Sequence, residues 1–266
     1  MPEGHTLHRL ARLHQRRFAG APVAVSSPQG RFAAAAVDGR VLRRASAWGK
    51  HLFHHYTDGP IVHVHLGLYG TFNEWPRPAG EPLPEPVGQV RMRMVGAEYG
   101  TDLRGPTVCE LIDESGVDDV LARLGPDPLR RDAEPSWAWA RITKSRRPIG
   151  ALLMDQTVIA GVGNVYRNEL LFRHRIDPYR PGQKIGEAEF DAAWSDLVAL
   201  MRVGLRRGKI IVVRPDHDHG PPSYGPGRPR TYVYRRAGEP CRVCGETIRT
   251  AVLEGRNVFW CPACQT

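Results

Sequence analysis

Four cysteines near the end of the chain have the spacing of a metal site. Cys241 and Cys244 form one Cys-x2-Cys pair, and Cys261 and Cys264 form a second pair after 16 intervening residues. Two such pairs let two β-hairpin knuckles offer four thiolates to one tetrahedral Zn²⁺. Two disulfides are the alternative, but the chain starts without an apolar signal segment, and thiols inside the cell stay reduced. The spacing therefore predicts one structural zinc ion.

The first residues offer a nucleophile. A small residue, Pro2, follows Met1, so we expect removal of the initiator methionine to expose the secondary amine of Pro2. An α-amino group has a pKa of about 7.7–8.0 against about 10.4 for lysine, so much more of it is unprotonated at neutral pH. Such an amine can attack an electrophilic carbon and form an iminium ion, and Glu3 beside it can move protons. Taken alone, however, Met-Pro-Glu is more often simply the start of a chain.

Three further positions are candidates for binding phosphate. The segment GVGN at 161–164 has glycines for a tight turn and then Asn164 at the start of a helix, where backbone N–H groups and the helix N-terminus attract an anion. Lys50 stands at the start of a strand, and Arg256 lies on the hairpin that leads into the second cysteine pair. Each has an ordinary alternative: a plain helix turn, a surface lysine and a solvated turn residue.

Composition limits the class of protein. With 37 Lys and Arg against 28 Asp and Glu, the chain carries a formal charge of +9, which favours polyanions but is weak evidence alone. The contents of 41% hydrophobic and 24% charged residues are typical of a globular protein. No apolar run is long enough to span a membrane, so we expect a soluble, cytoplasmic protein with no membrane partner.

The elements that must position these residues fall into two halves. Residues 6–18 have helical spacing, and residues 23–111 read as short alternating strands punctuated by Gly and Pro, which predicts a sandwich or flattened barrel. The second half is helical. We place an N-terminal domain at 1–125, a linker at 126–136, a helical domain at 137–236 and a zinc-binding hairpin at 237–266. The predicted fold class is α+β with two domains.

In combination these motifs resemble one known family. MPEG at the start, GK at Lys50, HLGLYG at 65–70, LLMDQTVIAGVGNVYRNELL at 152–171, and GEPCRVCG with NVFWCPACQ are similar to the formamidopyrimidine-DNA glycosylase and endonuclease VIII family. The resemblance covers essentially the whole chain. It implies an N-terminal helix plus β-sandwich domain, a helix-two-turn-helix domain and a C-terminal β-hairpin zinc finger, with DNA in the cleft between them.

The resemblance also implies an activity: a bifunctional DNA glycosylase and abasic-site lyase of base excision repair. Pro2 would attack the sugar C1′ of a damaged nucleotide, expel the oxidised base and, through the Schiff base, drive β- and then δ-elimination that nicks the strand. Glu3 would protonate the sugar oxygen or shuttle protons. Lys50 would hold a phosphate near the lesion and act with these two residues.

Other matching residues would bind the DNA. Asn164 would bind backbone phosphate from the helix-two-turn-helix, and Arg256 would do so from the zinc finger. Glu169, in the same motif as Asn164, would help to orient the catalytic end. The damaged nucleotide must leave the duplex, and Leu68 and Tyr69 match the loop whose residues fill the gap in endonuclease VIII-like members.

The chain departs from the family pattern at several points. His5 and Thr6 stand where a proline and a glutamate are usual, and Gly67 stands where the wedge often begins with a larger polar residue. The segment 214–230 does not match the base-capping loop of the oxidised-guanine enzymes. Together with Leu68 and Tyr69, this favours the endonuclease VIII-like branch and oxidised pyrimidines as substrates.

Two other classes of function remain open at this point. A non-catalytic module would recognise damaged or single-stranded DNA through the zinc ribbon and the basic helical domain. A zinc-ribbon protein acting on RNA or in a transcription complex would show no preference for lesions. A monomer is expected in each case.

Overall fold

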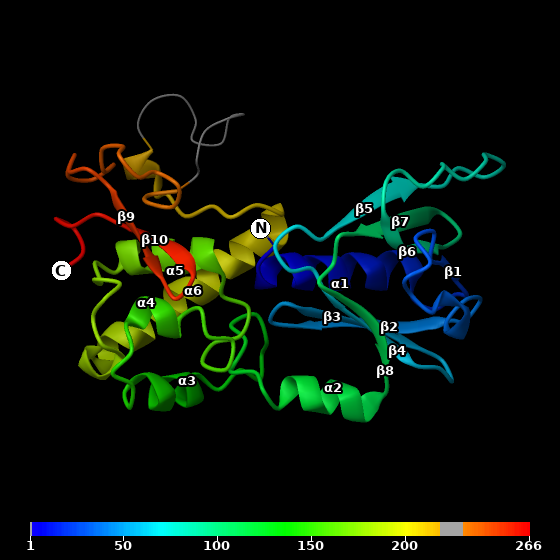
Figure 1. Ribbon diagram of the computed structural model, residues 1–266, viewed down its shortest axis with the longest axis horizontal. Helices are drawn as coiled ribbons and strands as arrows, with labels where there is room; N and C mark the ends of the chain where they lie inside the picture. The colour runs from blue at the N-terminus through cyan, green and yellow to red at the C-terminus, as the bar shows by residue number, and fades with distance from the viewer. Residues whose placement is uncertain (1, 219–230) are drawn as a thin grey trace. The chain divides into compact units, whose positions relative to one another are not determined.

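The computed structural model describes residues 2–218 and 231–266, and the chain divides into two compact units, residues 1–123 and 124–266 (Figure 1). Residues 219–230, which make up most of the segment that departs from the family pattern, lie outside the described residues. Within the described ranges, no helix is both long and apolar enough to cross a membrane.

The first unit opens with helix α1, Gly4–Phe18. Its stripe of Leu7, Ala11 and Phe18 is buried, while Arg16 and Arg17 lie in the last turn, where cations complement the negative end of the helix. The sequence predicted a start at residue 6. The helix begins two residues earlier because Glu3, in extended conformation, occupies the N-cap position.

Eight strands follow and form two four-stranded antiparallel sheets, as the predicted sandwich requires. The first sheet has the order β1-β6-β7-β5, and the second has the order β2-β3-β4-β8. The strands are β1 (Ala24–Ser26), β2 (Leu42–Trp48), β3 (His51–Tyr56), β4 (Ile61–His65), β5 (Thr71–Pro76), β6 (Val90–Val95), β7 (Tyr99–Arg104) and β8 (Val108–Ile112). A 3-10 turn, η1 (Ala34–Ala36), and helix α2 (Glu114–Leu121) complete this unit.

Apolar side chains from both sheets and from α1 share one core, in which Leu52, Val64, Met92 and Leu103 are fully buried. A polar cluster crosses this core. His14 of α1 bonds through Nδ1 to Nε2 of His54 in β3 and through Nε2 to Oε1 of Glu74 in β5, each over 2.9 Å. The helix is therefore tied to a strand of each sheet.

In its described part, residues 124–218 and 231–266, the second unit holds four helices and two short 3-10 turns. They are α3 (Pro135–Ile142), α4 (Ile149–Leu152), α5 (Asn164–Arg173), η2 (Gly182–Lys184), α6 (Glu187–Arg207) and η3 (Pro215–His217). Helix α5 starts at Asn164, as the GVGN segment predicted, and α6 ends at Gly208, whose φ of 67° closes the helix in the left-handed conformation. Figure 1 shows α5, α6 and the terminal hairpin gathered in this unit.

Part of the segment predicted as a linker packs into the second unit. Residues 125–128 are buried. The N–H of Gly125 donates to the carbonyl of Gln156, and the N–H of Ala160 donates to the carbonyl of Pro126. These bonds satisfy backbone groups of the segment, which a solvated linker would have left to water.

A β-hairpin ends the chain. Strands β9 (Arg249–Leu253) and β10 (Arg256–Trp260) pair in antiparallel register, and the two residues between them, Glu254 and Gly255, both have positive φ, 45° and 74°. This is the backbone of a tight two-residue turn that matches the twist of its strands. Together with the four cysteines it forms the predicted hairpin zinc finger.

Candidate functional site

The first residues of the chain lie at a pocket of the first unit. This pocket, of about 370 Å³, is lined by three segments: Pro2, Thr6 and Leu10; Leu66, Leu68, Tyr69 and Gly70; Thr71 and Phe72. Pro2 is half-buried. The structure thus brings together the predicted nucleophile and the predicted wedge residues, which are 66 positions apart in the sequence. A larger hollow of about 600 Å³ elsewhere in this unit includes none of the predicted site residues.

The N-terminus of α1 lies next to Pro2 in the sequence and contributes to the electrostatics around it. Glu3 is fully buried, and its carbonyl accepts a hydrogen bond from the N–H of Thr6 over 2.8 Å. The first turn of α1 contains no acidic residue, so Glu3, at the N-cap, is the carboxylate at the positive end of the helix dipole.

His5 and Thr6, the two departures from the family pattern, flank this region. Burial, and after it nearby positive charges that include His8 and Arg9, lower the pKa of His5 to about 4. His5 is therefore neutral at pH 7. Its Nε2 lies 3.4 Å from the hydroxyl of Thr6, so an uncharged pair stands where the family has proline and glutamate.

The turn at 66–70 presents the two wedge residues. Tyr69 is 87% exposed, a high value for an aromatic side chain, and Leu68 is half-buried. The turn is tight: Gly67 has a φ of 65°, and a Cβ there would lie 1.8 Å from the hydroxyl oxygen of Thr107. The N–H of Gly70 donates to the carbonyl of Leu66 over 2.9 Å. Gly67 is thus required by the backbone of the turn.

Lys50 lies in the turn between β2 and β3, next to Gly49, whose φ is 55°. Two histidines stand close by. Burial is the largest cause that lowers the pKa of both His51, to about 3, and His65, and the charge of Lys50 lowers both further. The lysine is therefore a cation among neutral imidazoles at neutral pH, which suits contact with a phosphate.

Asn164 is buried at the start of α5 and its side chain is engaged. Its Nδ2 donates to the carbonyl of Asn257 in β10 over 3.0 Å, and its Oδ1 accepts from Arg167 and Asn168. Asn168 in turn accepts the N–H of Phe259 through Oδ1 over 2.7 Å. These contacts fix the N-terminus of α5 against the zinc finger hairpin.

Glu169 is fully buried, and both of its carboxylate oxygens are occupied. Oε2 accepts the N–H of Tyr232 over 2.6 Å, and Oε1 accepts the N–H groups of Val233 and Tyr234 over 3.0 and 2.8 Å. The carboxylate therefore anchors the backbone that follows residue 230. With these oxygens taken up inside the fold, Glu169 positions a segment and presents nothing to a ligand.

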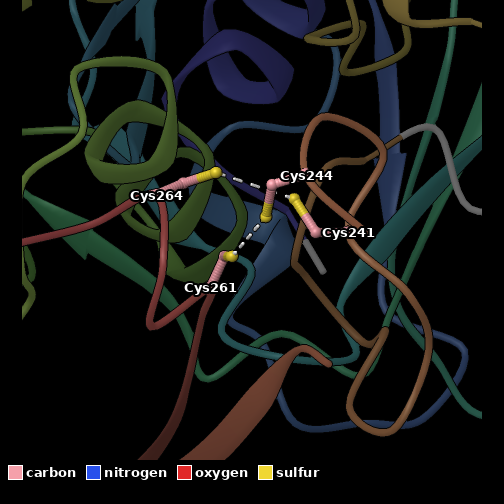
Figure 2. A group of neighbouring side chains, drawn as sticks. All are labelled: Cys241, Cys244, Cys261 and Cys264. Atoms are coloured by element: carbon pink, nitrogen blue, oxygen red, sulfur yellow. Dashed lines mark hydrogen bonds between the residues drawn. The ribbon is translucent and has the colours of Figure 1, made fainter. Parts of the chain in front are cut away.

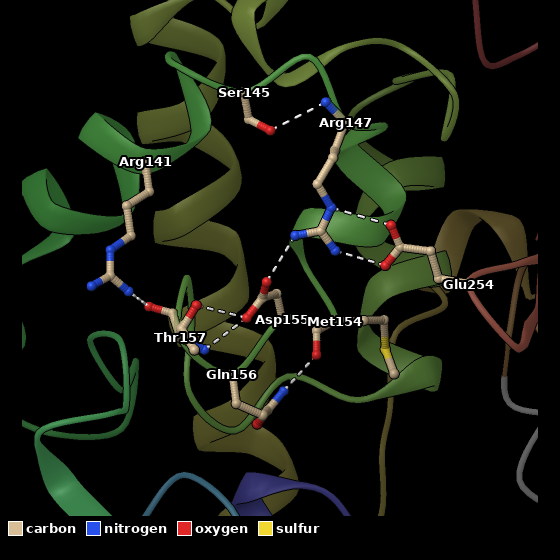
Figure 3. Close-up of polar contacts among 8 residues, drawn as sticks. All are labelled: Arg141, Ser145, Arg147, Met154, Asp155, Gln156, Thr157 and Glu254. Atoms are coloured by element: carbon tan, nitrogen blue, oxygen red, sulfur yellow. Dashed lines mark hydrogen bonds and ion pairs between the residues drawn. The ribbon is translucent and has the colours of Figure 1, made fainter.

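Arg256 is exposed at the first position of β10. The turn before it is held in place by Arg147, whose guanidinium bonds both oxygens of Glu254 over 3.2 and 2.7 Å and Oδ2 of Asp155 over 2.9 Å (Figure 3). Asp155 also accepts from the N–H and hydroxyl of Thr157. The loop before α5 and the tip of the hairpin are thereby clamped together.

The four predicted zinc ligands converge. Their Sγ atoms all lie within 4.8 Å of one another, with 3.9 Å between Cys241 and Cys264 and 3.4 Å between Cys244 and Cys261 (Figure 2). A tetrahedral zinc with Zn–S bonds near 2.3 Å places its sulfurs about 3.8 Å apart. The donor set and its size fit one Zn²⁺, whose chemistry here is structural: it cross-links the two ends of the hairpin.

Several residues that support these sites carry no signal in the sequence. Arg147, Asn168 and Thr107 each make a contact with a residue at least 40 positions away, which no local motif reports. One signal was available: Arg167, Asn168 and Glu169 are three consecutive polar residues in an apolar helix, and all three are buried.

Models of known families match nearly the whole chain. Residues 1–106 match the formamidopyrimidine-DNA glycosylase N-terminal domain, residues 124–215 match the formamidopyrimidine-DNA glycosylase H2TH domain, and residues 238–266 match the zinc finger found in FPG and IleRS. The chain therefore belongs to the formamidopyrimidine-DNA glycosylase and endonuclease VIII family, and the expected fold is confirmed.

Individual relatives indicate the branch. The chain is 84% identical to Endonuclease 8 1 of Mycobacterium tuberculosis (strain ATCC 25618 / H37Rv) and 33% identical to Endonuclease 8 2 of Mycobacterium bovis (strain ATCC BAA-935 / AF2122/97), in both cases over 100% of each chain. It is an endonuclease VIII-like DNA glycosylase and abasic-site lyase of base excision repair.

Solved structures show the same fold. The complex between the Lactococcus lactis Fpg and an abasic site containing DNA aligns with a TM-score of 0.80 at 20% identity, over 99% of both chains. MutM in complex with carbocyclic 8-oxo-G containing DNA aligns with a TM-score of 0.79 at 21% identity, over 100% of both. These likenesses concern the fold.

Proposed function

We propose that Pro2, freed of Met1, is the nucleophile of this enzyme. Its nitrogen lone pair forms a bond to C1′ of the damaged nucleotide, and the glycosidic bond breaks. The base leaves with the electron pair of the glycosidic bond and takes up a proton. Opening of the sugar ring gives the iminium, from which β-elimination breaks the C3′–O3′ bond and δ-elimination breaks the C5′–O5′ bond. The observation that carries this proposal is the position of Pro2 at the pocket lined by Leu68 and Tyr69.

Glu3 and the end of α1 serve this chemistry in our proposal. A carboxylate next to the nucleophile moves the protons that the ring opening and eliminations require. Glu3 is the N-cap residue of α1, so the start of the helix holds this carboxylate next to Pro2. The neutral His5 and Thr6 pair leaves Glu3 as the carboxylate adjacent to Pro2 in the sequence.

We also propose how damaged DNA is held. Lys50 and the exposed Arg256 contact backbone phosphates, and the N-terminus of α5 adds its positive end. The side-chain amide of Asn164 donates to Asn257, so Asn164 contributes by fixing that helix end. Glu169 acts in the same indirect way, through the backbone of residues 232–234. The exposed ring of Tyr69 stacks on the bases beside the gap, and the neighbouring Leu68 helps to fill it.

Oxidised pyrimidines are the substrates that we propose. Support comes from the wedge of two consecutive residues and from the identity to relatives named Endonuclease 8. We further propose that the enzyme is a monomer and works in the cytoplasm, where thiols stay reduced and can bind zinc. A panel of oligonucleotides with single lesions tests the substrate: faster excision of oxidised guanine than of oxidised pyrimidines contradicts the proposal.

Borohydride trapping tests the nucleophile. With DNA that contains an abasic site, the reductant converts the iminium to a stable amine, so wild-type protein should give a covalent protein–DNA adduct. Pro2→Gly exposes a primary amine of different geometry, and a variant that retains Met1 exposes none at Pro2. We expect a loss of trapping of at least about tenfold in both, the effect of about 1.4 kcal/mol on the barrier. Full trapping with Met1 retained contradicts the assignment of Pro2.

A further inference from the structure

The turn that carries Leu68 and Tyr69 is bonded to a histidine in the strand before it. The N–H of Gly67 donates to Nδ1 of His65 over 3.1 Å. An imidazole nitrogen accepts a hydrogen bond only when it carries no proton, so neutral His65 must hold its ring proton on Nε2. One contact thus fixes both the tautomer of the histidine and the position of Gly67, the second residue of the turn.

Other contacts hold His65 and the turn close together, so the bond between them is kept. The N–H of Thr107 donates to the carbonyl of His65 over 2.9 Å, and the same threonine fills the space beside Gly67. The N–H of Gly70 closes the turn on Leu66. His65 is therefore the one side chain among these contacts that bonds directly to the backbone of the turn. Tyr69 stands exposed in the same turn, two positions after Gly67.

The groups around His65 keep Nδ1 available as an acceptor. Lys50 lies in the β2–β3 turn, His51 lies opposite in β3 with its ring centroid 5.0 Å away, and His63 lies in the same strand. The neighbour in β8 is the apolar Val108. Burial, then the charge of Lys50, then His63 lower the pKa of His65. Protonation of Nδ1, which would turn two donors toward each other, is thus disfavoured at neutral pH.

We propose that His65 is a positioning residue: through Nδ1 it holds the 66–70 turn in the conformation that presents Leu68 and Tyr69 to the gap left by an extruded nucleotide. This role rests on the proposed function of the wedge. It adds a residue whose effect on DNA passes through the backbone N–H of Gly67.

The tautomer can be measured in the wild-type protein. Long-range ¹H–¹⁵N spectra of histidine-labelled protein at neutral pH should show His65 with a bare Nδ1 and a protonated Nε2. The opposite tautomer, with the proton on Nδ1, overturns the proposal. This measurement needs no substitution, so it is unaffected by any loss of folding in a variant.

Two substitutions that differ by one methylene separate the two ring nitrogens. In His65→Asn, the side-chain oxygen can accept an N–H two residues ahead, as in an Asx turn. In His65→Gln, the amide reaches toward the position of Nε2 and the short-range acceptor is lost. The readout is the fluorescence of 2-aminopurine placed opposite an abasic-site analogue, which rises when the wedge separates the bases.

We expect the affinity measured by this signal to stay within about twofold of wild type in His65→Asn and to fall about two- to tenfold in His65→Gln, the range of one lost hydrogen bond. Equal behaviour of the two variants, or retention in His65→Gln alone, overturns the proposal. Wild-type protein that gives no borohydride adduct contradicts the proposed function instead, so the two failures are distinguishable.

Discussion

At the scale of single residues, backbone conformation decides what the pocket can present. Gly67 combines a positive φ with a close neighbour, and the departure from the family pattern at this position follows from both. A larger residue would have to adopt a strained backbone and displace Thr107. The wedge that we propose is therefore limited to Leu68 and Tyr69, and the glycine makes the turn that carries them possible.

Gly67→Ala tests this reading against a matched control. Gly30 has nearly the same φ, 69° against 65°, but no described heavy atom lies within 4 Å of a Cβ placed there. We expect Gly30→Ala to cost about 1–2 kcal/mol from the left-handed backbone alone, and Gly67→Ala to cost more because Thr107 must move. Urea unfolding measures both. Equal losses of unfolding free energy in the two variants would show that Thr107 moves aside at no cost.

At the scale of elements, buried polar contacts set the position of α1. Glu74 of β5 accepts from His14 and Arg17 of α1 and from Thr101 of β7. Since the first turn of the same helix carries Pro2 toward its pocket, a shift of α1 would move the proposed nucleophile. The cluster around Glu74 therefore connects the core of the sandwich to the pocket of Pro2 through α1.

Glu74→Gln should make this link visible in the pH dependence of stability. Burial favours the protonated form of Glu74, but the hydrogen bonds from His14, Thr101 and Arg17 outweigh it and hold the pKa below the usual 4.5. A lowered pKa stabilises the fold above pH 4.5, and the stabilisation is lost as the pH falls below that value. We expect the free energy of unfolding of the variant to be about 1–3 kcal/mol lower than that of the wild type at pH 7. This difference between the two proteins should become smaller in acid. A difference in unfolding free energy that does not change with pH would contradict the ionised carboxylate of Glu74 as its cause.

The clamp between Arg147 and Glu254 is the second contact at this scale. It joins the loop before α5 to the tip of the hairpin that carries Arg256 (Figure 3). Both side chains are nearly half exposed, so we expect a coupling of only about 0.5–1 kcal/mol between Arg147→Ala and Glu254→Ala in a double-mutant cycle. The cycle is measured on the affinity for DNA. Strictly additive losses would mean that the clamp does not position Arg256.

At the scale of the whole molecule, zinc stabilises the terminal hairpin, the smallest part of the second unit. The terminal hairpin has two strands, and an isolated two-stranded hairpin is marginal in water. Zinc binding contributes about 10–16 kcal/mol of apparent free energy in small domains. The two units have separate cores, so loss of the metal should destabilise the second unit and leave the first unit folded.

Removal of zinc by a chelator should therefore abolish DNA binding while the first unit keeps its fold. We expect one zinc per chain by colorimetric assay before treatment, and protection from hydrogen exchange to disappear from β9 and β10 but to persist in β3 and β4. Cys244→Ser is the matching variant. A full zinc content in that variant, or unchanged exchange in the hairpin after chelation, would contradict the four-cysteine site.

Sequence alone predicted the parts of this protein whose chemistry is local. The cysteine pairs and the GVGN start of α5 are contiguous patterns, and the alternation of residues in β4 and β6 follows from the period of a strand. The start of α1 was predicted two residues late because Glu3 is not a usual cap. Asn164 was expected to bind phosphate and Glu169 to help orient the catalytic end. A motif identifies a residue but not the direction of its side chain, so the burial of both side chains could not be predicted.

The sequence by itself determined the family, the zinc ligands and the order of the elements, because each depends on residues close together in the chain. Only the tertiary structure decided that Pro2 and Tyr69 line one pocket, that Glu169 holds the backbone of Tyr232, and that His65 bonds to the wedge turn. These pairings depend on how strands and helices pack or on the exact path of a turn. Packing is a property of the whole unit, so no local pattern encodes it.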